Sequence, residues 1–183
     1  MIEGNENRIL IGGPQGSGKS TQGKLLAKVL EIPYVSTGDI SRELAEQDSK
    51  EGKRVKQLLA QGKFTPDDVI AKYVKDRLDQ TDCSLGFVMD GYPRSLDQLK
   101  YFDPQYNKVF YLDVPDDVVV GRLVKRGRED DTQDLIQERL KIYHRLTEPV
   151  LNFYQDQGIL CRIDGVATIE KIQEEIRGYI KNG

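Results

Sequence analysis

Cysteine and histidine are scarce in this sequence of 183 residues. The two cysteines, Cys83 and Cys161, lie far apart in the chain, and His144 is the single histidine. Disulfide frameworks need several cysteines, and zinc sites need closely spaced cysteine and histidine ligands. We therefore expect neither a disulfide-stabilised fold nor bound zinc. Each cysteine is expected to be a small buried hydrophobic residue, and His144 a structural or surface residue.

The sequence also lacks a long hydrophobic run and an excess of positive charge. No apolar stretch approaches the roughly 20 residues that span a bilayer, and residues 1–10 have no basic segment followed by a long apolar one. The formal net charge of -3 argues against a general affinity for nucleic acid. We predict a cytoplasmic protein that binds neither membranes nor nucleic acids. Periodicity alone reveals no surface for self-association, and we expect a monomer.

Short hydrophobic segments alternate with longer amphipathic ones. The short segments are rich in β-branched or aromatic residues and span residues 8–12, 34–36, 86–90, 108–114 and 160–164. The longer segments have helical character and span residues 19–31, 66–78, 116–126, 131–157 and 168–180. This alternation predicts an α/β fold, with a five-stranded parallel sheet flanked by helices. Residues 37–66 are polar and punctuated by glycines, which predicts a small helical flap inserted into a single domain over residues 1–183.

Residues 13–20 form the most specific motif of the chain. Their sequence GPQGSGKS fits the pattern GxxxxGK(S/T), and it follows the first predicted strand and opens the first predicted helix, as a P-loop requires. The glycines let the backbone curl so that its N–H groups point at phosphate oxygens. Lys19 would reach the β- and γ-phosphates, and Ser20 would contact a magnesium ion bound to them. The predicted ATP-binding residues here are Gly13, Gly16, Ser17, Gly18, Lys19, Ser20 and Thr21.

A P-loop occurs in GTPases, motor ATPases and small-molecule kinases, so other residues must discriminate among these classes. Two anions that exchange a phosphoryl group need several cations, and arginine binds phosphate in bidentate fashion. Arg42 and Arg94 follow predicted strands, where ligands of open α/β sheets gather. More arginines lie within residues 122–145, and the alternative for them is a solvated helix face: Arg122, Arg126, Arg128, Arg139 and Arg145.

Four motifs together resemble those of the adenylate kinase family. Besides the P-loop, they are residues 36–42 (STGDISR), 90–98 (DGYPRSLDQ) and 128–131 (REDD), which occur in the order of that family. The resemblance implies a P-loop NTPase fold in which the helical insertion binds a nucleoside monophosphate (NMP). It also implies that the γ-phosphoryl group of Mg-ATP moves reversibly to AMP, giving two ADP.

The resemblance assigns the acceptor site residue by residue. Arg42 and Arg94 would clamp the AMP phosphate, while Gln98 would read the adenine edge and Thr37 would contact the base. A glutamine amide offers a donor and an acceptor together, which suits adenine. Relatives that phosphorylate UMP or CMP tend to have asparagine at the position of Gln98 and alanine at the position of Thr37. Both residues of this chain therefore favour AMP. The implied AMP-binding residues are Thr37, Gly38, Arg42, Phe64, Thr65, Gly91, Arg94, Gln98, Arg128 and Arg139.

The resemblance also assigns the donor side and the catalytic cations. Arg122 would lie at the donor adenine, and Arg126 would bind ATP. The implied catalytic residues surround the phosphates and are Lys19, Arg94, Arg126, Arg128 and Arg139. Because only Gly127 separates Arg126 from Arg128, the lid is a minimal loop over residues 126–131, without room for a zinc-binding lid. We expect incomplete closure over the donor and slower turnover than in relatives with longer lids.

Magnesium is the expected cofactor, held through the nucleotide. Asp90 ends a hydrophobic strand, where an unpaired carboxylate would be costly. Asp39 and Asp90 are predicted to contact magnesium through water, with a purely structural hydrogen bond as the alternative for Asp90. Ser20 stands where the family commonly has glycine, which leaves donor specificity open. No side-chain base is required, because an anionic acceptor oxygen can be the nucleophile.

Two other functions remain open from the sequence. One is a kinase for UMP, CMP, GMP or dAMP, which Thr37 and Gln98 disfavour. The other is a nucleotide-binding regulatory module with weak ATPase activity, which the shortened lid favours. Cations at both phosphate ends argue against the regulatory module, which would not need them.

Overall fold

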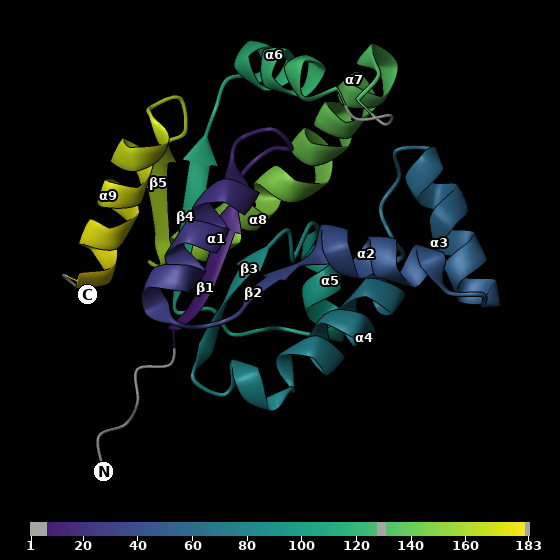
Figure 1. Cartoon of the computed structure of the whole chain (residues 1–183), viewed down its shortest axis with the longest axis horizontal. Helices are drawn as coiled ribbons and strands as arrows, with labels where there is room; N and C mark the ends of the chain where they lie inside the picture. The colour runs from purple at the N-terminus through teal and green to yellow at the C-terminus, as the bar shows by residue number, and fades with distance from the viewer. Residues whose placement is uncertain (1–6, 128–130, 182–183) are drawn as a thin grey trace.

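The computed structural model describes residues 7–127 and 131–181 (Figure 1). Parallel strands form one sheet in the order β2-β3-β1-β4-β5. The strands are β1 (Asn7–Gly12), β2 (Tyr34–Ser36), β3 (Gly86–Asp90), β4 (Lys108–Asp113) and β5 (Leu160–Asp164). The predicted α/β sheet is confirmed, with strand bounds that agree to within one residue.

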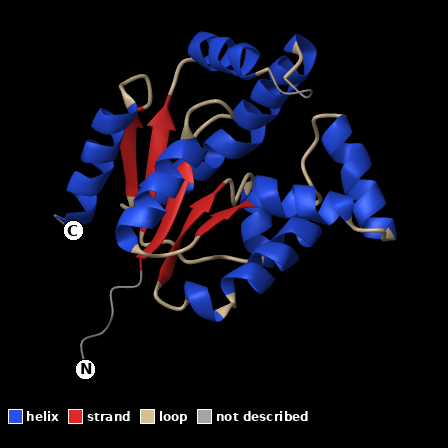
Figure 2. Cartoon of the chain, viewed as in Figure 1, coloured by secondary structure: helices blue, strands red, loops and turns tan. Residues whose placement is uncertain are grey.

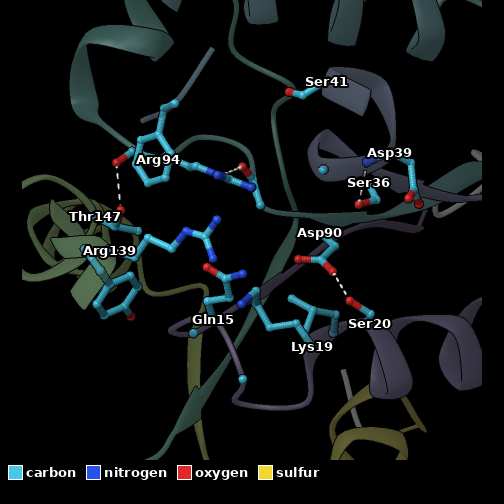
Figure 3. Close-up of a pocket in the computed structure, with 18 of the residues that line it drawn as sticks. Gln15, Lys19, Ser20, Ser36, Asp39, Ser41, Asp90, Arg94, Arg139 and Thr147 are labelled. Carbon is cyan, nitrogen blue, oxygen red and sulfur yellow. Dashed lines mark hydrogen bonds between the residues drawn. The ribbon is translucent and has the colours of Figure 1, made fainter. Parts of the chain in front are cut away.

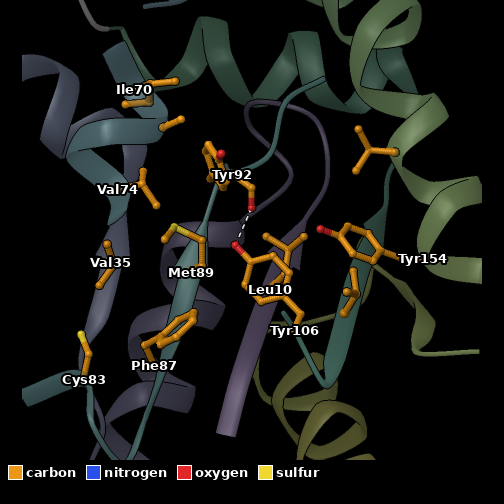
Figure 4. Close-up of a cluster of buried hydrophobic side chains, with 13 residues drawn as sticks. Leu10, Val35, Ile70, Val74, Cys83, Phe87, Met89, Tyr92, Tyr106 and Tyr154 are labelled. Atoms are coloured by element: carbon orange, nitrogen blue, oxygen red, sulfur yellow. Dashed lines mark hydrogen bonds between the residues drawn. The ribbon is translucent and has the colours of Figure 1, made fainter. Parts of the chain in front are cut away.

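Helices cover both faces of this sheet (Figure 2). Side chains alternate along β1, so Ile9 and Ile11 face one way and Leu10 the other. The first face packs against α1 (Lys19–Leu30) and α9 (Ile169–Lys181). The second packs against α4 (Asp67–Leu78) and α8 (Glu148–Asp156), in the cluster of Figure 4. Burial on both faces is why these strands read as nearly continuous hydrophobic runs.

The segment between β2 and β3 carries two helices that extend away from the sheet, on the side opposite α9 (Figure 1). They are α2 (Thr37–Glu46) and α3 (Lys50–Ala60), and Ser36 and Ser49 cap their N-termini with side-chain oxygens. Their buried residues Leu44 and Val55 form a small cluster with Val69 of α4. We call this the flap cluster. It is separate from the clusters on the two faces of the sheet.

The helix predicted over residues 131–157 differs from the structure. The observed helical stretch begins at Gln133 and has three parts. They are α7 (Gln133–Ile142), a π-helical segment (Tyr143–Thr147) and α8. Pro149 lacks the N–H that would continue the α-helical ladder, and the Glu148 N–H bonds to the Tyr143 carbonyl, five residues back. The wider turn therefore lies where proline interrupts the regular pattern.

The remaining elements complete the frame of the site. Helix α5 (Leu96–Tyr101) was not predicted, because six residues are too few to show a helical period. Helix α6 (Asp116–Arg126) ends at Gly127, beyond which the predicted lid loop lies partly outside the described residues. Within the described ranges, no helix is both long enough and apolar enough to cross a bilayer.

Cys83 and His144 have the structural roles expected of them, whereas Cys161 is less buried than expected. Cys83 is buried and Cys161 half-buried, and both are free thiols that pack against the core. His144 is a surface residue whose ring nitrogens contact the carboxylates of Asp116 and Glu148. Those carboxylates raise the pKa of His144.

Candidate functional site

A cavity of about 740 Å³ lies at the carboxyl ends of β1 and β3, between the flap helices and the helices α6 and α7 (Figure 3). Three predicted site residues, Ser17, Thr37 and Gln98, are buried behind its wall. Arg128 lies outside the described residues, so its role stays a prediction. The other predicted residues line the cavity: Gly13, Gly16, Gly18, Lys19, Ser20, Thr21, Gly38, Asp39, Arg42, Phe64, Thr65, Asp90, Gly91, Arg94, Arg122, Arg126 and Arg139.

Close packing shapes the P-loop at one end of the cavity. Gly13 has φ of 139°, and a Cβ atom there would lie 2.9 Å from the Leu112 carbonyl oxygen. Gly16 has φ of 88°, and a Cβ atom there would lie 2.9 Å from Leu123 Cγ in α6. A side chain at either position would meet both backbone strain and a collision. The loop is thus a backbone cradle pressed between β4 and α6.

Lys19 is held inside this cradle. Its ammonium group donates a hydrogen bond to the Pro14 carbonyl at 2.7 Å. Burial lowers the pKa of Lys19 to about 8, an effect that Asp90 opposes and that Arg94 and Arg126 reinforce. The loop thus confines a cation whose charge is costly until an anion joins it.

We expect the affinity for ATP to fall as the pH rises above about 8. Bound phosphates would raise the pKa of Lys19 again, so below pH 8 the lysine is charged with or without ATP and the affinity is constant. Above pH 8, binding takes up a proton, and the association constant falls by up to about tenfold per pH unit. Calorimetry in buffers of different ionisation heat measures both quantities. Lys19→Arg stays charged and should lack the slope; a constant wild-type affinity up to about pH 9.5 would contradict the linkage.

Asp90 lines the cavity and accepts two hydroxyl hydrogen bonds on one oxygen. Ser20 Oγ lies 2.9 Å and Tyr34 Oη 2.6 Å from Asp90 Oδ2. Burial, and then the Asp90 carboxylate, raise the pKa of Tyr34, so its hydroxyl stays protonated and donates. Asp39 also lines the cavity. Hydroxyl and carboxylate oxygens are what magnesium binds, directly or through water, so this donor set fits the ion.

The arginines of α6 and α7 converge on a buried carboxylate. Arg126 donates from Nε and Nη2 to the two oxygens of Asp131, at 2.8 and 2.6 Å. Arg139 Nη1 lies 3.8 Å from the same carboxylate. Arg122 instead donates to the backbone carbonyls of Ser17 and Gly165 and so joins α6 to the P-loop. Asp131 thus holds Arg126 with the kind of bidentate contact that a phosphate would make, and it keeps a second predicted phosphate ligand, Arg139, close by.

Arg94 lines the cavity on the side of the flap and makes several contacts there. It donates from Nε to the Gly91 carbonyl at 3.0 Å and from Nη2 to Thr37 Oγ1 at 3.1 Å. Its Cζ atom lies 4.6 Å from the centre of the Phe64 ring, a cation–π contact. Its carbonyl accepts a 2.8 Å hydrogen bond from Thr147 of the π-helical segment (Figure 3). Arg94 is therefore held by the turn after β3, by the flap and by the π-helical segment together.

The other predicted acceptor residues are divided between the wall and the layer behind it. Arg42 lines the cavity and pairs with Asp39, one turn earlier in α2. Gln98 lies behind the wall, where its Oε1 accepts from the Arg94 N–H at 2.7 Å and its Nε2 donates to Asp67 at 2.8 Å. In this arrangement the glutamine amide supports the Arg94 backbone, and reading of a base by Gln98 stays a prediction.

Sequence reasoning missed Tyr34, Asp131 and Thr147 as contributors to the site. From the sequence, Tyr34 is indistinguishable from any other strand residue, and Asp131 is one of several acidic residues at the start of a predicted helix. The spacing of four residues from Arg139 through Tyr143 to Thr147 was the one available signal, because such residues share a helix face.

Phosphate-binding backbone on one side and arginines on two others define a class of enzyme. A P-loop at the carboxyl end of a central parallel strand binds a nucleotide's phosphates. Arginines from the turn after β3, from α6 and from α7 face the same space, which suits a second phosphate-bearing substrate. Fold and site together are those of a P-loop kinase that acts on nucleoside monophosphates.

Comparisons with known proteins specify the family. The family model for adenylate kinase matches residues 10–159. An adenylate kinase of Xylella fastidiosa is 41% identical over 180 residues, which cover 92% of this chain and 96% of that protein. Adenylate kinase 1 of a Nostoc species is 37% identical and covers 94% and 98%. An adenylate kinase of Micrococcus luteus is 41% identical and covers 92% and 88%. The chain belongs to the adenylate kinase family.

Proposed function

We propose that this chain transfers the γ-phosphoryl group of Mg-ATP to AMP and gives two ADP in a reversible reaction. One observation carries the proposal: Lys19 of the P-loop and Arg94 beside the flap face one cavity together with Arg126 and Arg139. A protein that only binds or hydrolyses ATP needs cations at the donor phosphates. Cations at a second phosphate position are useful when a phosphorylated acceptor binds there.

The donor half is formed by the P-loop, α6 and α7. The P-loop amides and Lys19 bind the β- and γ-phosphates, and Arg122 faces the donor nucleoside. Arg126 and Arg139 release the Asp131 carboxylate and bind the phosphoryl group that is being transferred. Arg128 is a further ligand of that group. Charge stabilisation and positioning supply the catalysis, because the acceptor oxygen is already anionic.

The acceptor half is formed by the flap (residues 37–66) and the turn after β3. Arg42 and Arg94 hold the AMP phosphate, with the Gly91 backbone beside them. Phe64 and Thr65 close over the base, while Gly38, Thr37 and Gln98 shape its site. We infer that the flap moves toward the substrates, which excludes water from the phosphoryl group.

Magnesium would lie between the nucleotide phosphates and the carboxylates. Ser20 would ligate the ion, and Asp39 and Asp90 would hold its water ligands. The ion supplies positive charge at the β- and γ-phosphates and neutralises charge that develops during transfer. The protein's own contribution is the orientation of Ser20 by Asp90, which accepts its hydrogen at 2.9 Å.

An ADP-forming assay with Mg-ATP and each of AMP, dAMP, UMP, CMP and GMP tests the proposal. We expect rapid turnover with AMP and at least about tenfold lower kcat/KM for the pyrimidine nucleotides, because a base site built for adenine leaves polar groups unpaired with them. Arg94→Ala is the blank and should lose the acceptor-dependent signal.

The assay also separates the other functions. Preferred turnover with UMP, CMP or dAMP would mean that the chain is a kinase for that monophosphate and not for AMP. ATP hydrolysis that ignores every monophosphate, with the same rate in Arg94→Ala, would overturn phosphotransfer in favour of the regulatory module.

A further inference from the structure

Tyr34 is a cavity residue without a part in the proposed reaction so far. It begins β2, at an edge of the sheet, and its half-buried side chain reaches the cavity. Its hydroxyl donates to Asp90 Oδ2 at 2.6 Å, the shorter of the two side-chain hydrogen bonds to that oxygen. A tyrosine placed only for packing would not need a buried carboxylate as its partner.

The two hydroxyls together fix how the Asp90 carboxylate is turned. Oδ2 accepts from both Tyr34 and Ser20, which accounts for the two lone pairs of that oxygen. In Figure 3, the other carboxylate oxygen points away from Ser20, toward the side of the cavity where Lys19 and Arg139 lie. The carboxylate thus keeps one oxygen directed at the space for phosphates and metal.

The same bonds orient the Ser20 hydroxyl. A hydroxyl has one hydrogen and two lone pairs. Because its hydrogen is committed to Asp90, Ser20 has only lone pairs to offer to the cavity. Lone pairs are what a cation requires, so the chain Tyr34 to Asp90 to Ser20 ends in an oxygen prepared to ligate a divalent ion.

Gly23 of α1 accommodates the Tyr34 ring. A Cβ atom on Gly23 would lie 2.7 Å from Tyr34 Cε2 and 3.1 Å from Cδ2. A glycine inside a helix is unfavourable relative to alanine. Helix α1 accepts that cost, and its N-terminal residues are Lys19 and Ser20. The slot therefore places the tyrosine hydroxyl close to Ser20, the last residue of the P-loop motif.

We propose that Tyr34 is a positioning residue for the divalent cation of Mg-ATP, acting through Asp90 on Ser20. The inference rests on the proposed function, because it concerns the metal that this reaction uses. Tyr34 touches neither the metal nor the substrates. It holds Asp90 in the rotamer that gives Ser20 its ligating orientation, and it keeps the second carboxylate oxygen available for metal-bound water.

Tyr34→Phe tests this, because it keeps the ring in its slot and removes only the hydroxyl. The measurement is the affinity for ATP by calorimetry, with magnesium and again with a chelator, and the readout is the ratio of the two. We expect the ratio to fall by about tenfold or more, as for other residues that orient metal ligands, while the metal-free affinity is unchanged. Tyr179→Phe, on the exposed part of α9, is the matched control and should leave the ratio unchanged.

A second pair of variants tests the slot. Gly23→Ala should displace the ring and lower the same ratio, whereas Gly178→Ala, in α9 with open space around it, should not. An unchanged ratio in Tyr34→Phe would overturn the proposal, and so would an equal loss of metal-free affinity, which indicates a packing role. The readout is binding, so a wild-type chain that failed to form ADP would overturn the proposed function without deciding this one.

Discussion

Replacing Arg94 with lysine is expected to lower kcat/KM for AMP by about 10²–10³-fold, with little change in ATP affinity. The guanidinium group contacts Gly91, Thr37 and the Phe64 ring at the same time, and an ammonium group has neither the planar shape nor the donors to do so. Burial lowers the pKa even of Arg94, so a lysine in this environment would also be driven toward its neutral form. The loss should therefore exceed that of a simple change in charge position.

Steady-state kinetics with AMP as the varied substrate measure this loss, and ATP affinity is measured separately. Arg177→Lys, on the exposed side of α9, is the matched control, with kinetics like the wild type. If Arg94→Lys kept the wild-type kcat/KM for AMP, Arg94 would be a structural residue and another cation would have to hold the acceptor phosphate.

Lys19→Met is expected to reduce kcat by about 10²–10³-fold without lowering the unfolding temperature. Burial lowers the pKa of Lys19 to about 8, which means that the folded state disfavours its charged form relative to the unfolded chain. Methionine has a similar length and no charge to desolvate, and this gain offsets the lost hydrogen bond to Pro14. The variant should be as stable as the wild type, or more so, while its turnover is strongly reduced.

Thermal unfolding and ADP formation are measured on the same preparation. Lys28→Met serves as the control, because Lys28 lies at the exposed end of the same helix. Wild-type turnover in Lys19→Met would remove the lysine from the phosphate site. A large fall in unfolding temperature would mean that the Pro14 contact stabilises the loop more than the buried charge destabilises it.

The strands and the P-loop were predictable because their signals are local. Runs such as the one ending at Asp90 contain β-branched and aromatic residues whose two faces are both buried, and that pattern is readable in one dimension. The loop around Lys19 was recognisable from glycine spacing next to a strand and a helix. Family resemblance then identified the arginines that line the cavity, which are Arg42, Arg94, Arg122, Arg126 and Arg139.

What the sequence could not predict depends on contacts between distant segments. The pairing of Asp131 with Arg126 across the end of α6 has no periodic signature, and neither does the bond from Thr147 to the Arg94 carbonyl. The contacts of the Gln98 amide with Asp67 and the Arg94 backbone were likewise not predicted, and its reading of a base stays a prediction. Short elements such as α5 are likewise determined by caps and packing rather than by a hydrophobic period.

The flap cluster has a consequence for behaviour at high temperature. Leu44, Val55 and Val69 bury far less surface than the clusters on the sheet, so α2 and α3 open at a lower free energy than the strands do. On warming, the acceptor site would be lost first, while β1 and its neighbours stayed folded. The activity of this protein should therefore decline below its melting temperature and return on cooling, because the intact sheet provides the surface on which the flap refolds.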